Sequence, residues 1–410
     1  MYRVSPFVSR FALALLAGAT LATIWVNLAP ATYYDSIEWR LFDVALPGWL
    51  ARLPFSLTPL MLVSDVLMTF FLFFLAKELW EALILEHGAL RGQRALLPLA
   101  LVFGGMAGAV LVWTITASLI ETAEEAGFAT GWPVPLGSDV VLGYLVGRRI
   151  FGPGHPALHF LLVLTIIADI AALVVMGVSH LDISLRLLWL ILPVAASLAV
   201  WALFGRRPPD HASEQRKRAT LLLWPYMLAG LMCWFGVAAS GLPPALGLLP
   251  VVPAIAHANR TFGLFAETEG LLHDPLNRLA QLMAWPLVGV LFLFGLTCGG
   301  VDLLAFAPTT ATTLAALWLG RPLGMLVIGL GLAALAGLPL PPGISLRDIL
   351  RITLIMSMGF TVPVLGLDST LPGGAMQEAA RLGLAISLIS GLVALLVWRR
   401  KDALVAHTTA

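Results

Sequence analysis

Hydrophobic positions in this 410-residue chain come in long unbroken runs rather than in an alternating pattern. An α-helix needs about 20 apolar residues to cross a bilayer, whereas a transmembrane β-barrel would show short alternating segments. The pattern therefore predicts an all-α polytopic membrane protein that forms a single domain over residues 1–410. The twelve predicted spans are residues 11–28, 60–86, 95–120, 134–150, 157–178, 185–205, 219–239, 243–258, 279–298, 308–337, 348–367 and 380–398.

Composition strengthens this interpretation and excludes a soluble protein. The chain is 59% hydrophobic and only 11% charged, and its mean hydropathy is +0.93. Soluble domains are about a quarter charged, because polar side chains must cover the surface that faces water. The net charge of +1 provides no basic surface for nucleic acid.

The sequence carries no motif for an enzyme or a cofactor. There is no phosphate-binding loop, nucleophile elbow or zinc-ligand spacing. Cys233 and Cys298 both lie in apolar runs and indicate neither a disulfide framework nor a metal site. We therefore expect neither a cofactor nor an enzymatic activity.

Lysine and arginine residues predict how the spans are oriented. Only Arg40, Arg52, Arg186 and Arg381 fall in odd-numbered connections, while most of the 24 basic residues lie at the two ends or in even-numbered connections. Because basic residues gather on the cytoplasmic side, both termini are predicted to be cytoplasmic. The stretch 29–58 then lies outside, and 206–218 and 259–278 are cytoplasmic loops.

Two of the predicted spans cannot be regular helices. The fourth opens with Gly131-Trp132-Pro133-Val134-Pro135-Leu136-Gly137-Ser138-Asp139, and the eleventh contains Met358-Gly359-Phe360-Thr361-Val362-Pro363. Proline removes a backbone donor, and unwound backbone survives at membrane depth only inside protein or beside a cavity. Paired breaks are typical of transporters built from inverted repeats, here spans three to five and ten to twelve. Ordinary proline kinks are the alternative.

Three charged residues lie where a membrane makes charge costly. Asp169 stands in a long apolar run with no local polar partner, which favours a functional role. Asp139 follows Ser138 at the first break, where it could also cap a half-helix. Arg321 lies inside the tenth span, where it could be a structural cation that neutralises an aspartate and the carbonyl ends of broken helices.

A further charged group lies toward the end of the second span. It contains Lys77, Glu78 and Glu81, and Asp65 lies near the start of the same span. A long lysine side chain near a span end can reach the membrane surface. We therefore expect a solvated or funnel-lining face there, with Lys77 extended toward water.

Several short stretches, in order along the chain, resemble the NhaA family of bacterial sodium/proton antiporters. The similarity runs from about Phe11 to Arg400. The matching stretches are residues 62–71, the break at 131–139, 166–169, 240–242, 299–301, 319–324, 359–361 and 380–384.

The resemblance implies roles for individual residues. Asp169 matches the family's cation- and proton-binding carboxylate, and the aspartate that usually precedes it is replaced by Ala168. Ser138 and Asp139 match a Thr-Asp pair and would complete a sodium site with Asp169. Arg321 stands in place of the family's lysine.

These departures suggest a changed stoichiometry. Arginine stays protonated at any working pH, whereas a buried lysine can release its proton. With Asp169 as the obvious carrier, we expect one sodium ion to exchange for one proton. The alternatives are another monovalent cation, a small anion held by Arg321, or a membrane sensor or scaffold that does not transport.

The family resemblance also bears on location and assembly. It implies a multi-pass protein of the bacterial inner membrane that works in pH homeostasis, with Na⁺, H⁺ and lipid as its partners. A homodimer is expected, and the outer segment 29–58 could form a hairpin at its interface. An ordinary interfacial segment with an aromatic belt is the alternative.

Overall fold

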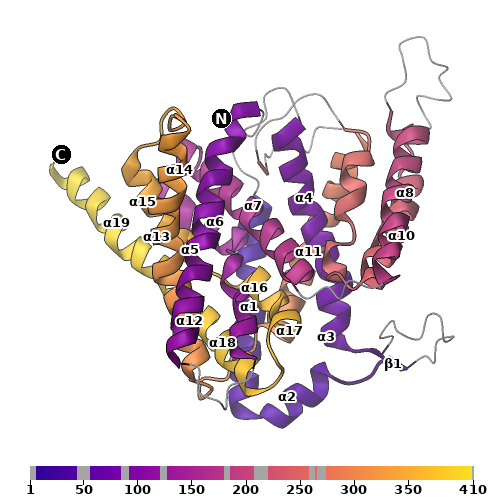
Figure 1. Cartoon of the computed structure of the whole chain (residues 1–410), viewed down its shortest axis with the longest axis horizontal. Helices are drawn as coiled ribbons and strands as arrows, with labels where there is room; N and C mark the ends of the chain where they lie inside the picture. Colours follow the sequence, from indigo (N-terminus) through magenta and orange to yellow (C-terminus); the bar gives the residue numbers. More distant parts are fainter. Residues whose placement is uncertain are drawn as a thin grey trace.

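The computed structural model describes residues 6–43, 56–84, 92–120, 127–179, 185–206, 220–257, 264–265 and 274–408. These residues are almost entirely helical (Figure 1), apart from one antiparallel pair of two-residue strands, β1 (Phe42–Asp43) and β2 (Ser56–Leu57). Within them, nine helices are long and apolar enough to cross a bilayer. This confirms the predicted all-helical fold with many membrane spans. The nine are Phe7–Leu28, Pro59–Ile84, Gly92–Ile120, Pro156–Ser179, Arg186–Gly205, Pro275–Cys298, Pro308–Leu335, Leu346–Leu365 and Ala375–Trp398.

Many of these spans are assembled from consecutive α-helical, 3₁₀ and π-helical pieces. The α-helices of the first half are α1 (Pro6–Leu28), α2 (Pro30–Ile37), α3 (Pro59–Met61), α4 (Met68–Ile84), α5 (Leu96–Ile120), α6 (Val140–Phe151), α7 (Pro156–Ser179) and α8 (Ile191–Val200). Those of the second half are α10 (Trp224–Ser240), α11 (Pro275–Cys298), α12 (Pro308–Ala315), α13 (Arg321–Leu323), α14 (Leu330–Leu335), α15 (Leu346–Met356), α16 (Thr361–Leu365), α17 (Leu367–Thr370), α18 (Ala375–Ser387) and α19 (Ile389–Thr408). The 3₁₀ and π-helical turns are η1 (Leu62–Leu67), η2 (Gly92–Ala95), η3 (Phe128–Gly131), η4 (Val134–Leu136), η5 (Leu185–Leu190), η6 (Trp201–Gly205), η7 (Pro244–Leu246), η8 (Leu249–Ala254), η10 (Ala316–Gly320) and η11 (Gly324–Gly329).

Three predicted spans differ from full-length helices. The fourth contains only the 12-residue α6, which follows the short turns η3 and η4. The seventh is the 17-residue α10. The eighth, predicted over 243–258, is a shorter apolar segment made of two 3₁₀ turns, η7 and η8, rather than one regular helix. Prolines in this stretch remove the backbone donors that an α-helix would need.

Helix ends are set locally by capping side chains. Asp274 accepts a hydrogen bond from the backbone of Asn277 at the start of α11, where Pro275 takes the first helical position. Ser345 and Asp348 form a reciprocal capping box at the start of α15. A cap forms hydrogen bonds with the backbone donors that the first helical turn leaves unpaired. The starts of α11 and α15 therefore carry a local sequence signal.

Parts of the predicted connections lie outside the described residues. Of the outer segment 29–58, residues 44–55 are not described, and the pair β1–β2 lies on either side of that gap. The predicted loops 206–218 and 259–278 also fall largely outside. Their placement therefore stays a prediction.

Glycines allow α5 to touch the span that contains α12 to α14 backbone to backbone (Figure 1). A Cβ atom on Gly108 would overlap the carbonyl oxygen of Gly320, and one on Gly324 would overlap that of Gly104. Within each span the two glycines are four residues apart, Gly104 and Gly108 in one and Gly320 and Gly324 in the other. This spacing allows membrane helices to approach closely. We call this contact the glycine seam, defined by Gly104, Gly108, Gly320 and Gly324.

The glycine seam should tolerate no added methyl group. We expect Gly108→Ala to lower the free energy of unfolding by about 1–3 kcal/mol, because the new atom must displace backbone rather than a flexible side chain. Thermal melting of the purified protein in detergent measures the loss. Gly289→Ala is the matched control, since a Cβ there meets no atom within 4 Å. Equal melting temperatures for the two variants would contradict the prediction.

Candidate functional site

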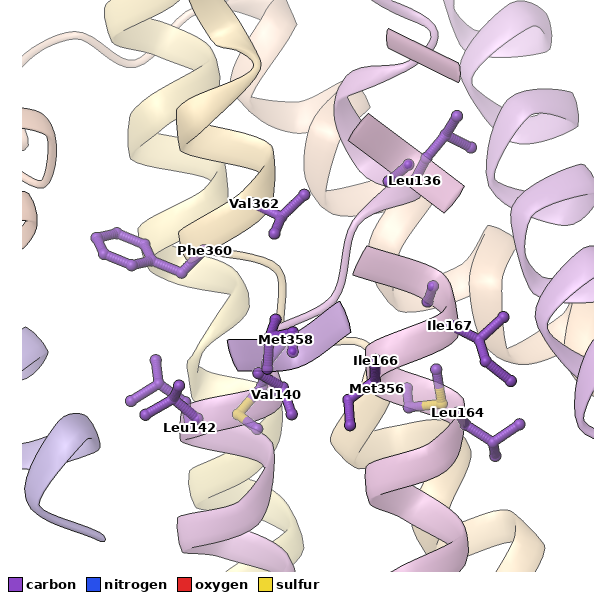
Figure 2. Packing of buried hydrophobic residues seen from close by; sticks show 14 of the residues in the cluster. Leu136, Val140, Leu142, Leu164, Ile166, Ile167, Met356, Met358, Phe360 and Val362 are labelled. Carbon is purple, nitrogen blue, oxygen red and sulfur yellow. The ribbon is translucent and has the colours of Figure 1, made fainter. Parts of the chain in front are cut away.

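The two broken spans cross inside the core. The backbone is extended at Gly137 and Asp139 before α6 begins, and residues 357–360 separate α15 from α16. Figure 2 shows Leu136 and Val140 on either side of the first break, Met358 and Phe360 within the second, and Val362 just after it. Apolar side chains thus enclose both unwound stretches. The two predicted interruptions are present.

Asp169 lies in the middle of α7 and faces the first break. Its side chain is 1% exposed. The Oδ1 atom accepts hydrogen bonds from the backbone nitrogen of Ser138 at 2.7 Å and from the Ser138 hydroxyl at 2.8 Å. The Oδ2 atom is buried and has no hydrogen-bond partner among the described residues. One carboxylate oxygen is therefore held in place while the other is available.

Asp139 joins the two breaks to each other. Its Oδ1 atom accepts from the Leu142 nitrogen at 2.7 Å, which caps α6. Its Oδ2 atom accepts from the Thr361 nitrogen at 3.0 Å and from the Thr361 hydroxyl at 2.6 Å. Both oxygens are thus engaged. The expected cap is present, and it extends to a partner on the other broken span.

Arg321 lies at the carbonyl ends of the helical pieces that precede the two breaks. Its Nη1 atom donates to the Met356 carbonyl at 2.7 Å, and Nη2 donates to the carbonyls of Pro135 and Gly137 at 2.6 and 2.7 Å. The last carbonyls of a helix lack intrahelical partners and carry partial negative charge. The guanidinium therefore satisfies both breaks at once, which agrees with the carbonyl part of the structural role expected from the sequence.

Sequence reasoning missed two hydroxyl residues of the crossing. Thr361 begins α16 and binds Asp139, and Ser387 of α18 accepts a hydrogen bond from the Gly359 nitrogen at 3.1 Å. In the sequence, Thr361 belongs to the second break and to the family-like stretch 359–361, but no role was predicted for its side chain. Because serine and threonine are common throughout the spans, no local pattern separates these two from the rest.

The charged group of α4 differs from expectation. Lys77 is fully buried and lies 3.0 Å from carboxylate oxygens of both Glu78 and Glu81. Glu78 also accepts from the Phe265 nitrogen at 2.6 Å, and Glu81 accepts from the Asn277 side chain at 3.2 Å. The prediction that Lys77 extends to water is wrong, because two neighbouring carboxylates and a distant helix enclose it.

A cavity of about 850 Å³ lies beside this charged group. Its walls come from α4, the start of α5, the first turns of α7 and the connection 336–344, and they include Glu78, Glu81, His159 and Val163. Val163 precedes Asp169 by six residues, which is about 9 Å along a helix. The funnel-lining role expected for Glu78 and Glu81 agrees with this position.

The donor set around Asp169 suits a small hard cation. Carboxylate, hydroxyl and backbone carbonyl oxygens are the ligands that alkali and alkaline-earth ions prefer. The residues that the structure describes contain no group of three or more His, Cys, Asp and Glu side chains that could hold a metal ion. Any ion at Asp169 would therefore be bound largely by neutral oxygens.

A buried carboxylate at the crossing of two broken helices, inside a many-span helical protein, defines a secondary transporter rather than an enzyme. The comparisons name the family. The model of the family described as "Na+/H+ antiporter 1" matches residues 8–398. The chain belongs to this family, which confirms the resemblance found in the sequence.

Curated relatives extend over nearly the whole chain. The "Na(+)/H(+) antiporter NhaA" of Jannaschia sp. (strain CCS1) is 37% identical over 409 residues, which cover 97% of each chain. That of Desulfitobacterium hafniense (strain DSM 10664 / DCB-2) is 31% identical over 395 residues, 95% of this chain and 93% of its own. "Na(+)/H(+) antiporter NhaA 2" of Pelobacter propionicus is 30% identical over 392 residues, 94% and 95% of the two chains.

Proposed function

We propose that this protein exchanges sodium ions for protons across a membrane and that Asp169 carries each ion in turn. The single observation that supports this is the state of its carboxylate. Oδ1 is fixed by two donors from Ser138, and Oδ2 is buried without a partner. A buried carboxylate must neutralise its charge by binding a proton or a cation. Competition between the two for one oxygen is sufficient for exchange.

The cavity beside α4 supports a route to this carboxylate. It ends about two helical turns from Asp169 and carries Glu78 and Glu81 on its wall. We propose that ions enter from this side, and that movement of spans three to five and ten to twelve against the remaining spans opens the opposite side. Such motion around a fixed midplane site is how broken-helix transporters alternate their access.

We further propose that the exchange is one for one. Ala168 cannot titrate, Arg321 stays protonated, and both oxygens of Asp139 already accept hydrogen bonds. Asp169 then carries one proton in one direction and one sodium ion in the other, so that the loaded site is neutral both ways. Asp139 would join the sodium site, as the sequence suggested, only if its contacts with Thr361 opened.

The contacts of Arg321 weigh against transport of an anion. Its two terminal nitrogens already donate to three backbone carbonyls. These bonds use three of the five N–H donors of the guanidinium. An anion that took any of the three would leave a buried carbonyl unpaired, which costs about 1–3 kcal/mol. The arrangement at Arg321 therefore favours cation transport.

Orientation and assembly belong to the same proposal. The distribution of basic residues supports a protein of the bacterial inner membrane with both termini in the cytoplasm. We propose a homodimer with the segment around β1 and β2 at its interface. Chemical cross-linking in native membranes tests the dimer, and labelling of a cysteine added near either end tests the orientation.

The stoichiometry predicts how transport responds to voltage. In proteoliposomes, sodium-driven proton movement should stop at the same pair of sodium and proton gradients whether the membrane potential is zero or clamped with potassium and valinomycin. A net charge moved across 100 mV would contribute about 2.3 kcal/mol to the driving force and would shift that balance point strongly. A balance point that moves with the potential would contradict one-for-one exchange. An absence of sodium-driven proton movement would contradict the antiport itself.

A further inference from the structure

Asp139 and Thr361 connect two broken spans that lie 222 positions apart in the chain. Asp139 immediately precedes α6, and Thr361 is the first residue of α16. Both side chains are 1% exposed. The carboxylate accepts three hydrogen bonds, one from the first turn of α6 and two from Thr361. This contact connects the broken span that contains α6 to the one that contains α16.

The Asp139 carboxylate has little freedom to move. Hydrogen bonds to an ionised acceptor are shorter and stronger than those between neutral groups, and the Thr361 hydroxyl approaches to 2.6 Å. Breaking these bonds in a buried place would leave an unpaired charge, which is costly. Asp139 is therefore held from both spans.

The position of Asp139 determines the position of Ser138. The two residues are adjacent in an extended stretch, so that one peptide plane links them. Ser138 is the residue whose backbone nitrogen and hydroxyl both reach Asp169, at 2.7 and 2.8 Å. A shift of Asp139 would therefore change both hydrogen bonds to the Asp169 carboxylate.

We propose that Thr361 is a positioning residue of the ion site: its hydroxyl, acting through Asp139, holds Ser138 against Asp169. This inference rests on the proposed sodium/proton exchange at Asp169. Thr361 binds Asp139 rather than the carrier, and its effect reaches Asp169 through Asp139 and Ser138. Through this contact, the sodium affinity at Asp169, beside the first broken span, depends on the second broken span.

The rest of the second break has separate supports. Arg321 holds the Met356 carbonyl, and Ser387 holds the Gly359 nitrogen. The Thr361 backbone nitrogen also remains bound to Asp139 when the hydroxyl is removed. Removal of the hydroxyl alone should therefore loosen the site while the span stays folded.

The test compares Thr361→Val with Thr361→Ser in proteoliposomes. Valine has nearly the shape of threonine without its hydroxyl, whereas serine keeps the hydroxyl. We expect Thr361→Val to raise the sodium concentration for half-maximal proton movement about tenfold, the equivalent of one hydrogen bond to a charged group. The maximal rate should change less, and Thr361→Ser should behave like the native chain.

Thr353→Val is the matched control. Thr353 is buried in α15 of the same span, and its hydroxyl donates to the Leu350 carbonyl rather than to the crossing. This variant should keep the native sodium dependence. A similar loss in both valine variants would assign the effect to the span as a whole and overturn the inference.

Asp139→Asn tests the same link from the other side, and it also serves if Thr361→Val does not fold. The asparagine should raise the half-maximal sodium concentration as well, and the double variant should lose less than the two single losses combined. Independent losses, or equal impairment by Thr361→Ser and Thr361→Val, would overturn the inference. A native chain without sodium-driven proton movement would overturn the proposed function, and this inference with it. Native exchange with an unchanged Thr361→Val variant would overturn this inference alone.

Discussion

Sodium-driven proton movement should disappear in the Asp169→Asn variant. The asparagine side chain can still accept hydrogen bonds from Ser138, so the local structure around Oδ1 should persist. It can neither bind a proton at working pH nor balance a sodium ion. We therefore expect exchange in proteoliposomes to fall to the level of empty liposomes at every pH and sodium concentration.

A second measurement separates lost function from lost structure. A carboxylate at the centre of a span costs about 2.5–3.5 kcal/mol on insertion scales, so Asp169→Asn should melt at the native temperature or higher. Sodium should raise the melting temperature of the native chain, because a ligand that binds only the folded state stabilises it. It should not do so for the variant. No sodium effect on the native chain would favour a scaffold.

Asp348→Asn is the matched control for this experiment. Asp348 is a buried carboxylate that caps α15 and pairs with Arg351 at 3.1 Å, away from the crossing. Its removal should leave exchange close to native. Near-native exchange by Asp169→Asn would contradict the assignment of the carrier, and loss of exchange in both variants would show that the assay reports general damage.

Arg321→Met should destabilise the protein more than any other single change proposed here. Methionine fills much of the same volume but leaves the carbonyls of Pro135, Gly137 and Met356 without their donor. Each unpaired buried carbonyl costs about 1–3 kcal/mol, so the combined loss should amount to several kcal/mol. We expect little monodisperse protein in size-exclusion chromatography and a much lower melting temperature.

Two further variants define this effect. Arg321→Lys keeps a cation with three donors and should recover part of the stability, although a lysine lacks the planar fork that reaches both breaks. Arg10→Met removes an exposed arginine that stacks on Phe7 and Trp285 and should change the melting temperature little. Equal melting temperatures for Arg321→Met and Arg10→Met would contradict the structural role of Arg321.

Much of the fold could be predicted because it depends on local physics. The length of apolar runs fixed most spans, and clustered proline and glycine located both breaks. Residues 243–258 form a shorter segment than hydropathy alone suggests, because the prolines of that stretch exclude a regular helix. The same property of proline that located the breaks explains the 3₁₀ turns of this span.

Asp169 and Arg321 could be selected from the sequence as candidate site residues, but their partners could not. A charge in a long apolar run is conspicuous, as at Asp169 and Arg321. The partners of Arg321 lie 35 to 186 positions away, and Asp139 meets Thr361 across 222. The burial of Lys77 could not be foreseen, because the partners that enclose its neighbours are distant in sequence: Asn277, which binds Glu81, lies 196 positions from Glu81. Such pairings depend on the tertiary fold, and no periodicity relates their members.

The glycine seam also limits how the molecule can deform. Where two helices meet backbone to backbone, neither can rotate about its axis without driving a carbonyl oxygen into a Cα atom. At Gly108, Gly320 and Gly324 the nearest atoms across the contact are backbone atoms, which cannot change rotamer as a side chain can. The span of α5 and the span of α12 to α14 should therefore move together as one rigid body. Bending is then left to the non-helical segments at 137–139 and 357–360, which adjoin the proposed ion site.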